Sequence, residues 1–126
     1  QAAILLPKLA ILDDEILARQ KIAESYDKLF NEIGITTTPF IEQHNQSAWA
    51  QYTIQVENRA EIQEKLKKQG IPTAVHYPIP LNKQPAVANF NVNLPIGDAI
   101  AEKVMSLPMH PYLTLEEQKK VVQGFL

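Results

Sequence analysis

The chain of 126 residues contains no cysteine and only four glycines. Without cysteine, neither a disulfide nor a thiolate-ligated metal site can form. The glycines form neither a phosphate-binding loop nor a nucleophile elbow. No run of about 18 apolar residues is present, so we expect no transmembrane helix. With 12 basic and 14 acidic side chains, the net charge of -2 argues against nucleic acid as a partner.

The composition is that of a globular protein. Hydrophobic residues make up 45% of the chain and charged residues 21%, and the length suits a single domain over residues 1–126. The first residue is Gln1 rather than Met, and apolar residues follow at once. We interpret this beginning as a cut through a longer protein, with a trimmed small protein as the alternative.

A long amphipathic helix is predicted near the beginning of the chain. From about Lys8 to Ile33, apolar residues recur at steps of three, four and seven, and Gly34 is a natural stop signal. The pair Asp13-Asp14 could mark a kink in this helix. Because the helix is long for so small a domain, we expect residues 1–34 to form a linker to a segment upstream.

Three more helices and three strands are predicted along the rest of the chain. Alternation over Ala48–Val56 predicts a strand with Trp49 on an otherwise polar outer face. The residues predicted to face the core are Ala48, Ala50, Tyr52, Ile54 and Val56. Further strands are predicted over Ile71–Tyr77 and Ser106–Met109. Helices are predicted after a cap at Asn58, over Ile96–Met105 and after the capping box of Thr114 and Glu117, with one more turn near Gln84–Ala88. The expected fold is α+β, with about three mostly antiparallel strands and helices on one face.

The three histidines are too far apart in sequence to suggest a zinc site, so no metal is expected. His44 is expected at the surface and His110 in a buried, hydrogen-bonded position. His76 ends the second predicted strand, before Tyr77 and a proline-rich loop, where binding groups are often placed. The residues alone leave open a simpler interpretation, in which His76 faces solvent and Tyr77 belongs to the core.

Three stretches together resemble a known family. They are GIPTAVHYPIPLNKQPA at Gly70–Ala86, QAAILL at Gln1–Leu6 and SLPMHPYL at Ser106–Leu113. They are similar to the C-terminal domain of the DegT/DnrJ/EryC1/StrS family of pyridoxal-phosphate-dependent sugar aminotransferases. The resemblance implies the small domain of a fold type I aminotransferase. The large domain, which holds the cofactor and its Schiff-base lysine, would then lie upstream, so this segment would carry no catalytic residue and bind no cofactor.

The resemblance also implies a substrate site. His76 and Tyr77 match the family's His-Tyr-Pro motif and would bind the nucleotide sugar in a cleft shared between the subunits of a homodimer. Asn82 stands where many relatives have His. With this variant, the segment Pro80–Pro85 looks most like the aminotransferases acting on UDP-2-acetamido-2-deoxy-3-oxo-glucuronate. The full-length protein would be a cytoplasmic enzyme that takes its amino group from glutamate, in bacterial O-antigen synthesis.

Two other functions stay open at this stage. Some members of the family lack the lysine and act as dehydratases, and the lysine position lies outside this chain. The third hypothesis is a non-catalytic α+β interaction domain. In the aminotransferase reading, the surface that faces the large domain should be unusually apolar, with the long first helix and Trp49 contributing to it.

Overall fold

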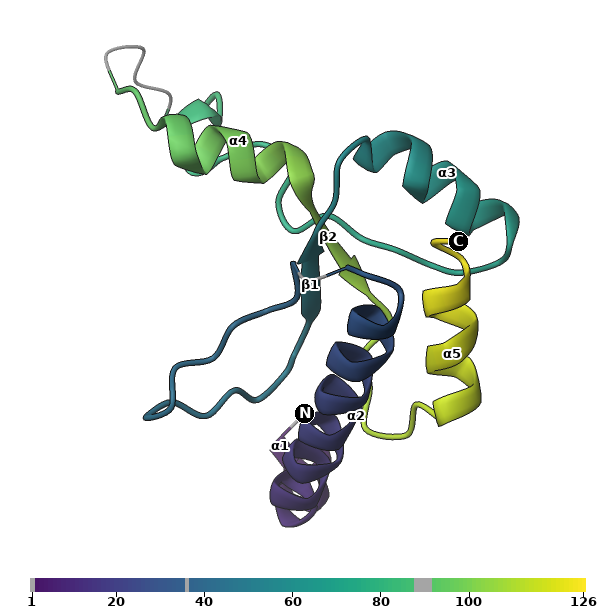
Figure 1. The fold of residues 1–126 in the computed structure, drawn as a ribbon. Coiled ribbons are helices and arrows are strands. Elements are labelled where there is room, and N and C mark those ends of the chain that lie inside the picture. The colour runs from purple at the N-terminus through teal and green to yellow at the C-terminus, as the bar shows by residue number, and fades with distance from the viewer. Residues whose placement is uncertain (1, 36, 88–91) are drawn as a thin grey trace.

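The computed structural model describes residues 2–35, 37–87 and 92–126 of the chain. Within these residues, the chain forms five α-helices, one 3-10 helix and a sheet of two strands. Their arrangement is shown in Figure 1. In chain order the elements are α1 (Ala2–Ala10), α2 (Leu12–Glu32), β1 (Tyr52–Gln55), α3 (Arg59–Lys68), η1 (Leu81–Lys83), α4 (Pro95–Lys103), β2 (Val104–Leu107) and α5 (Leu115–Gln123).

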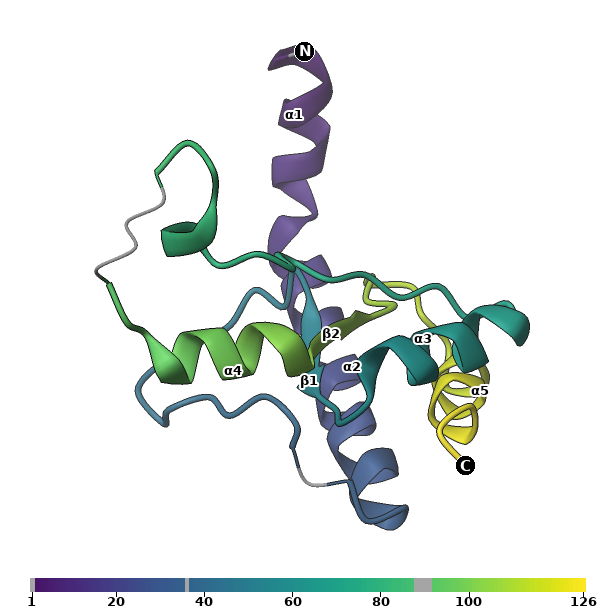
Figure 2. The ribbon, with the colours of Figure 1, turned by 90° about the horizontal axis from the view of Figure 1, so that it is seen from above.

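The predicted first helix is divided in two. The break lies at Ile11 rather than at Asp13-Asp14, because both aspartates belong to the first turn of α2, where carboxylates complement the helix dipole. At the far end Gly34 adopts a positive φ of 79°. That conformation lets the amide of Ile35 reach back to the carbonyl of Phe30 at 2.9 Å, a typical helix closure that confirms the predicted stop. Helix α1 projects from the rest of the molecule (Figure 2).

The sheet pairs β1 with β2 in antiparallel register, with Tyr52 opposite Leu107 and Ile54 opposite Met105. The prediction of a third full strand over Ile71–Tyr77 is wrong. Within the described residues this segment is extended but makes a single bridge, between Ala74 and Ser106. Pro72 lies within the segment and Pro78 follows it, and a proline cannot donate to a ladder, which limits how far the pairing can extend.

Strand β1 begins at Tyr52 rather than at Ala48, because Trp49 has a positive φ of 49° that interrupts the extended backbone. The indole therefore turns inward, where its Nε1 donates to Gln20 of α2 at 2.6 Å. Trp49 is only 5% exposed, so the prediction that it lies on an outer face is wrong. Tyr52, Ile54 and Val56 are buried as predicted, whereas Ala48 and Ala50, which the alternation also placed toward the core, are exposed.

The hydrophobic core lies on one face of the sheet. Tyr52, Ile54, Met105 and Leu107 share that face by register and alternation, whereas Thr53 and Ser106 bond to each other on the opposite face. Helices α2, α3 and α5 contribute the core side chains Ile22, Ala23, Tyr26, Phe30, Leu66, Val121 and Val122. Segments outside the helices and strands add Trp49, Val56 and Ile71. The predicted α+β class with helices on one face is therefore confirmed.

Several helix ends differ from the predictions. Asn58 occupies the N-cap position of α3, as predicted, but it has a positive φ of 53° and its side chain makes no cap bond. The capping box of Thr114 and Glu117 at α5 is confirmed. Helix α5 buries Gln118, Val121 and Val122. The side-chain amide of Gln118 donates to the carbonyl of Ile22, across the contact with α2.

The proline-rich stretch contains η1, which ends before the predicted turn at Gln84–Ala88 and does not overlap it; Ala88 lies outside the described residues. Helix α4 ends at Lys103 and β2 starts at Val104, earlier than the predicted strand Ser106–Met109. The buried β2 residues Met105–Leu107 set this boundary, since burial within the sheet outweighs the helical periodicity of that segment.

Candidate functional site

His76 and Tyr77 lie just beyond the bridge that links Ala74 to β2. Both side chains are exposed, and Tyr77 is 76% exposed. Their rings meet edge to face, with 6.1 Å between centroids. The alternative in which Tyr77 belongs to the core is therefore wrong, and both groups are available to a ligand or to another surface.

The segment that leads to His76 is anchored to the body. The amide of Ala74 donates to the carbonyl of Ser106 at 3.0 Å, and the amide of Ser106 donates to the carbonyl of Ala74 at 2.8 Å. One residue earlier, the side-chain amide of Gln63 on α3 donates to the hydroxyl of Thr73 at 3.1 Å. These bonds fix the backbone two residues before the imidazole.

The segment after Tyr77 is held by its own contacts. The amide of Lys83 donates to the carbonyl of Pro80 at 2.9 Å, and the side chain of Gln84 donates to the carbonyl of Ile79 at 3.0 Å. The ammonium of Lys83 lies 2.9 Å from a carboxylate oxygen of Asp98 on α4. The proline-rich loop is therefore folded on itself and tied to a helix.

The other two histidines lie elsewhere on the surface. His44 is exposed, as expected. His110 is exposed too, so the prediction of a buried structural histidine is wrong. The neighbouring carbonyls of Pro108 and Met109 instead accept hydrogen bonds from Tyr26 and Arg19, which hold this turn without the imidazole. Across the described ranges, no three His, Asp or Glu side chains gather as a metal site would require.

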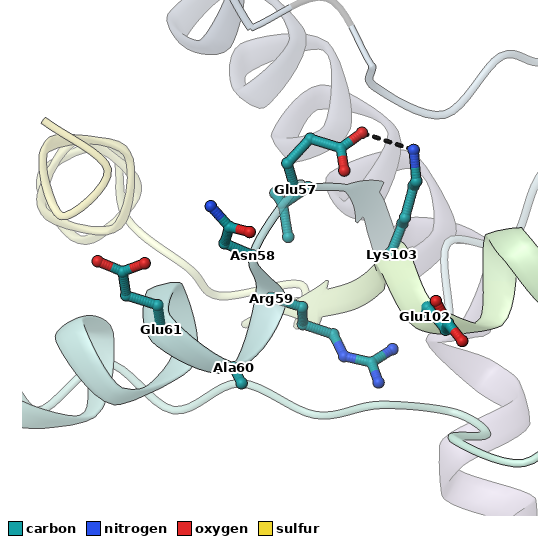
Figure 3. A pocket seen from close by; sticks show the side chains of 8 residues that line it. Glu57, Asn58, Arg59, Ala60, Glu61, Glu102 and Lys103 are labelled. Atoms are coloured by element: carbon teal, nitrogen blue, oxygen red, sulfur yellow. Dashed lines mark hydrogen bonds and ion pairs between the residues drawn. The ribbon is translucent and has the colours of Figure 1, made fainter.

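A shallow depression at the junction of β1, α3 and α4 gathers charged side chains (Figure 3). Its Arg59 guanidinium donates to the carbonyls of Ala101 and Val104, where α4 gives way to β2. At the rim Lys103 pairs with Glu57. Arg59 thus satisfies carbonyls at the end of α4. The sequence does not predict this contact, because a single arginine in a charged helix gives no local signal for partners more than 40 residues away.

Two carboxylates with lowered pKa values, Glu15 in α2 and Glu117 in α5, lie outside this depression and make contacts that support the helices. A hydrogen bond from Tyr112 lowers the pKa of Glu15, which also lies near Lys8 of α1. Hydrogen bonds from the backbone and hydroxyl of Thr114 lower the pKa of Glu117 in the capping box. Both shifts follow from donors that favour the charged form.

Apolar side chains are unusually exposed in two places. In α1 and the start of α2 they are Ile4, Leu5, Leu6, Leu9 and Leu12, with exposed fractions of 44% to 71%. The second place is the projecting part of the chain formed by residues 77–87 and α4, which we call the arm (Figure 1). There Tyr77, Leu81 and Ile96 are each at least 75% exposed. Such surfaces are typical of regions that meet another partner.

The lysines on the described surface do not fit a pyridoxal phosphate site by themselves. A Schiff-base lysine is activated by desolvation in a pocket. Here nine of the ten lysines are exposed, and the half-buried Lys103 is paired with Glu57. No catalytic step through the cofactor is therefore assigned to residues of this chain. None of the helices among the described residues is long and apolar enough to cross a membrane.

Comparison with protein families gives a match over the whole chain. Residues 1–126 match the model of the DegT/DnrJ/EryC1/StrS aminotransferase family. Over 113 residues the chain is 61% identical to the UDP-2-acetamido-2-deoxy-3-oxo-D-glucuronate aminotransferase of Pseudomonas aeruginosa, covering 90% of this chain and 31% of that protein. It is 36% identical to the dTDP-3-amino-3,6-dideoxy-alpha-D-galactopyranose transaminase of Aneurinibacillus thermoaerophilus, covering 98% of this chain and 34% of that protein.

Solved structures give the same result. An aminotransferase of this kind from Brucella abortus superposes with a TM-score of 0.90 at 39% identity, over 98% of this chain and 34% of that one. DesV from S. venezuelae superposes with a TM-score of 0.86 at 29% identity, over 99% of this chain and 34% of that one. The chain therefore spans about a third of the length of the proteins it matches.

Proposed function

Since the chain belongs to the DegT/DnrJ/EryC1/StrS aminotransferase family, we propose that it is the small domain of a pyridoxal-phosphate-dependent aminotransferase acting on a keto nucleotide sugar. The overall reaction exchanges the amino group of glutamate for the keto oxygen of the sugar. It yields 2-oxoglutarate and an amino sugar, so atoms and electrons balance without a further oxidant. When bound in the whole enzyme, the cofactor supplies the electron sink for this exchange.

The proposed substrate is a UDP-3-keto-hexuronate such as UDP-2-acetamido-2-deoxy-3-oxo-glucuronate. The observation that carries this proposal is the 61% identity to the Pseudomonas aeruginosa aminotransferase named for that sugar. The exposed pair His76 and Tyr77 fits the task chemically. A uronate carboxylate needs cationic or donor groups, and an imidazole and a phenol offer both.

His76 and Tyr77 are proposed to bind and orient the sugar rather than to move a proton during the exchange. Their side chains extend from a backbone held at Ala74, and Pro78 and Pro80 stiffen the segment that follows Tyr77. Orientation by groups on a stiff segment contributes to rate because it fixes the reacting keto carbon in place. We further propose that the site is completed in a homodimer, where exposed apolar residues of the arm would be covered.

The proposed function is tested with the full-length protein that carries this chain. The purified protein is incubated with pyridoxal phosphate, glutamate and either the UDP-3-keto-hexuronate or a dTDP-linked 3-keto-6-deoxyhexose. We expect 2-oxoglutarate and the amino sugar, measured by mass spectrometry, with the uronate preferred. A dehydrated sugar without nitrogen transfer would contradict the proposal and support a dehydratase. Preference for the deoxyhexose would contradict the substrate but not the reaction.

A further inference from the structure

The segment that carries His76 and Tyr77 is part of a closed ring of contacts. On one side, Ala74 is doubly hydrogen-bonded to Ser106 of β2. On the other side, Lys83 of η1 pairs with Asp98 of α4 at 2.9 Å. Helix α4 continues directly into β2, which returns to Ser106. The ion pair thus joins the end of the loop at Lys83 to α4 and β2, the same elements that hold its beginning at Ala74.

The body fixes the α4 side of this ring. Arg59 of α3 donates to the carbonyls of Ala101 and Val104 at the junction of α4 and β2. The hydroxyls of Thr53 and Ser106 lie 2.9 Å apart across the two strands. Because α4 is anchored at this junction, Asp98 in its first turn offers Lys83 a defined point of attachment.

The carboxylate of Asp98 depends on Lys83. Its side chain is 25% exposed, and its Oδ1 atom is buried with no hydrogen-bond partner in the part of the chain that the structure describes. The other oxygen, Oδ2, meets the ammonium of Lys83. Without the ammonium, the carboxylate would have no partner in this position among the described residues, so the pair favours the closed arrangement of the loop.

We propose that Lys83 and Asp98 act as a positioning pair, which holds the loop after Tyr77 so that His76 and Tyr77 meet the nucleotide sugar in the correct orientation. This inference rests on the proposed function. Lys83 is 53% exposed, and such a pair contributes little to global stability because solvent screens it. Its effect is therefore on the placement of the two side chains and not on folding.

The main test is Lys83→Met in the full-length protein, which keeps most of the length of the side chain and removes its charge. We expect KM for the keto sugar to rise about tenfold, because small misplacements of binding groups cost rate and affinity. The half-reaction with glutamate and the melting temperature stay unchanged. Lys68→Met is the matched control, since Lys68 pairs with Glu64 on α3 in an exposed position, and it leaves all three quantities unchanged.

Second variants decide whether Lys83 acts through Asp98. Lys83→Arg keeps the charge and is expected to keep the low KM. Asp98→Asn alone raises KM, and combining it with Lys83→Met adds little beyond either single change, since both remove the same contact. An unchanged KM in Lys83→Met would overturn the proposal. Additive losses in the double variant would also overturn it, because Lys83 would then act on the substrate directly.

A measurement without substrate separates this proposal from the proposed function. Hydrogen exchange of the amides between Tyr77 and Gln84 is expected to accelerate in Lys83→Met and not in Lys68→Met. Exchange that stays the same in both variants would contradict a positioning role, whatever the activity. If the unmodified protein turns over neither sugar, the proposed function fails, and the exchange result alone then decides whether the pair holds the loop.

Discussion

The body of the molecule and its arm use apolar residues in opposite ways. In the body, formed by α2, α3, α5 and the two strands, Tyr26, Phe30 and Tyr52 are completely buried. In the arm, Tyr77 and Leu81 are each 76% exposed. The body encloses its apolar side chains, whereas the arm exposes them on its surface. We expect substitutions in the body to change stability and substitutions in the arm to change binding.

The largest effect is expected from Phe30→Ala in the body. Phe30 contacts three other aromatic rings, including Phe125 edge to face at 5.3 Å between centroids. The cavity should cost about 3–5 kcal/mol of unfolding free energy. Urea denaturation followed by the fluorescence of the single, buried Trp49 measures it. Tyr77→Ala is the control, and a comparable loss there would refute the contrast between body and arm.

His76→Ala tests the arm side of the comparison. A lost charge-assisted hydrogen bond to the sugar should cost about 1.5–3 kcal/mol, or roughly ten- to a hundredfold in kcat/KM for the keto sugar. The half-reaction with glutamate and the melting temperature should survive in the full-length enzyme. His44→Ala, at another exposed histidine, serves as the control. Equal loss in both half-reactions with a lower melting point would make His76 structural.

Gly124→Ala should destabilise the body by overpacking. A Cβ atom at Gly124 would lie 2.5 Å from Cδ2 of Leu66 and 2.9 Å from Cδ1 of Ile71. Both neighbours are buried, so the added methyl group should cost about 1–3 kcal/mol. The same denaturation experiment measures the loss. Unchanged stability would mean that the contact between α5 and the end of α3 can relax.

Alkaline pH should also weaken the body. Burial raises the pKa of Tyr26, and burial together with the hydrogen bond to Asp27 raises the pKa of Tyr52. Above a pH of about 10 the unfolded chain releases these protons while the folded chain keeps them, so stability falls as pH rises. At a pH of about 10.5, each tyrosine should lower the free energy of unfolding by roughly 1 kcal/mol. Tyr26→Phe should flatten the curve, and an unaltered curve would contradict this assignment.

The smallest effect is expected in the arm, from Gly97→Ala. The nearest atom to an added Cβ is Cβ of Leu94 at 4.0 Å, so the methyl group meets open space. Alanine should stabilise α4 by up to about 1 kcal/mol, since it loses less backbone freedom than glycine. The direction is opposite to that at Gly124, which thermal melting of the two variants compares directly. A loss at Gly97 would show that the arm is as tightly packed as the body.

The sequence predicted the features that depend on local chemistry. The closure at Gly34 and the capping box of Thr114 need only neighbouring residues, and both are found. Alternation identified the buried face of β1 at Tyr52 and Ile54. The family was recognised from three short motifs because such motifs carry specific residues at fixed places, and the match over residues 1–126 confirms it.

Only the tertiary structure decided where the chain departs from its own periodicity. Trp49 turns inward because Gln20 and Arg19 of a distant helix meet its indole and carbonyl. The segment before His76 pairs with β2 through one bridge, between Ala74 and Ser106, rather than as a full strand. The ion pair of Lys83 and Asp98 joins residues on either side of a long loop. Contacts between residues far apart in sequence leave no local pattern, so folding alone reveals them.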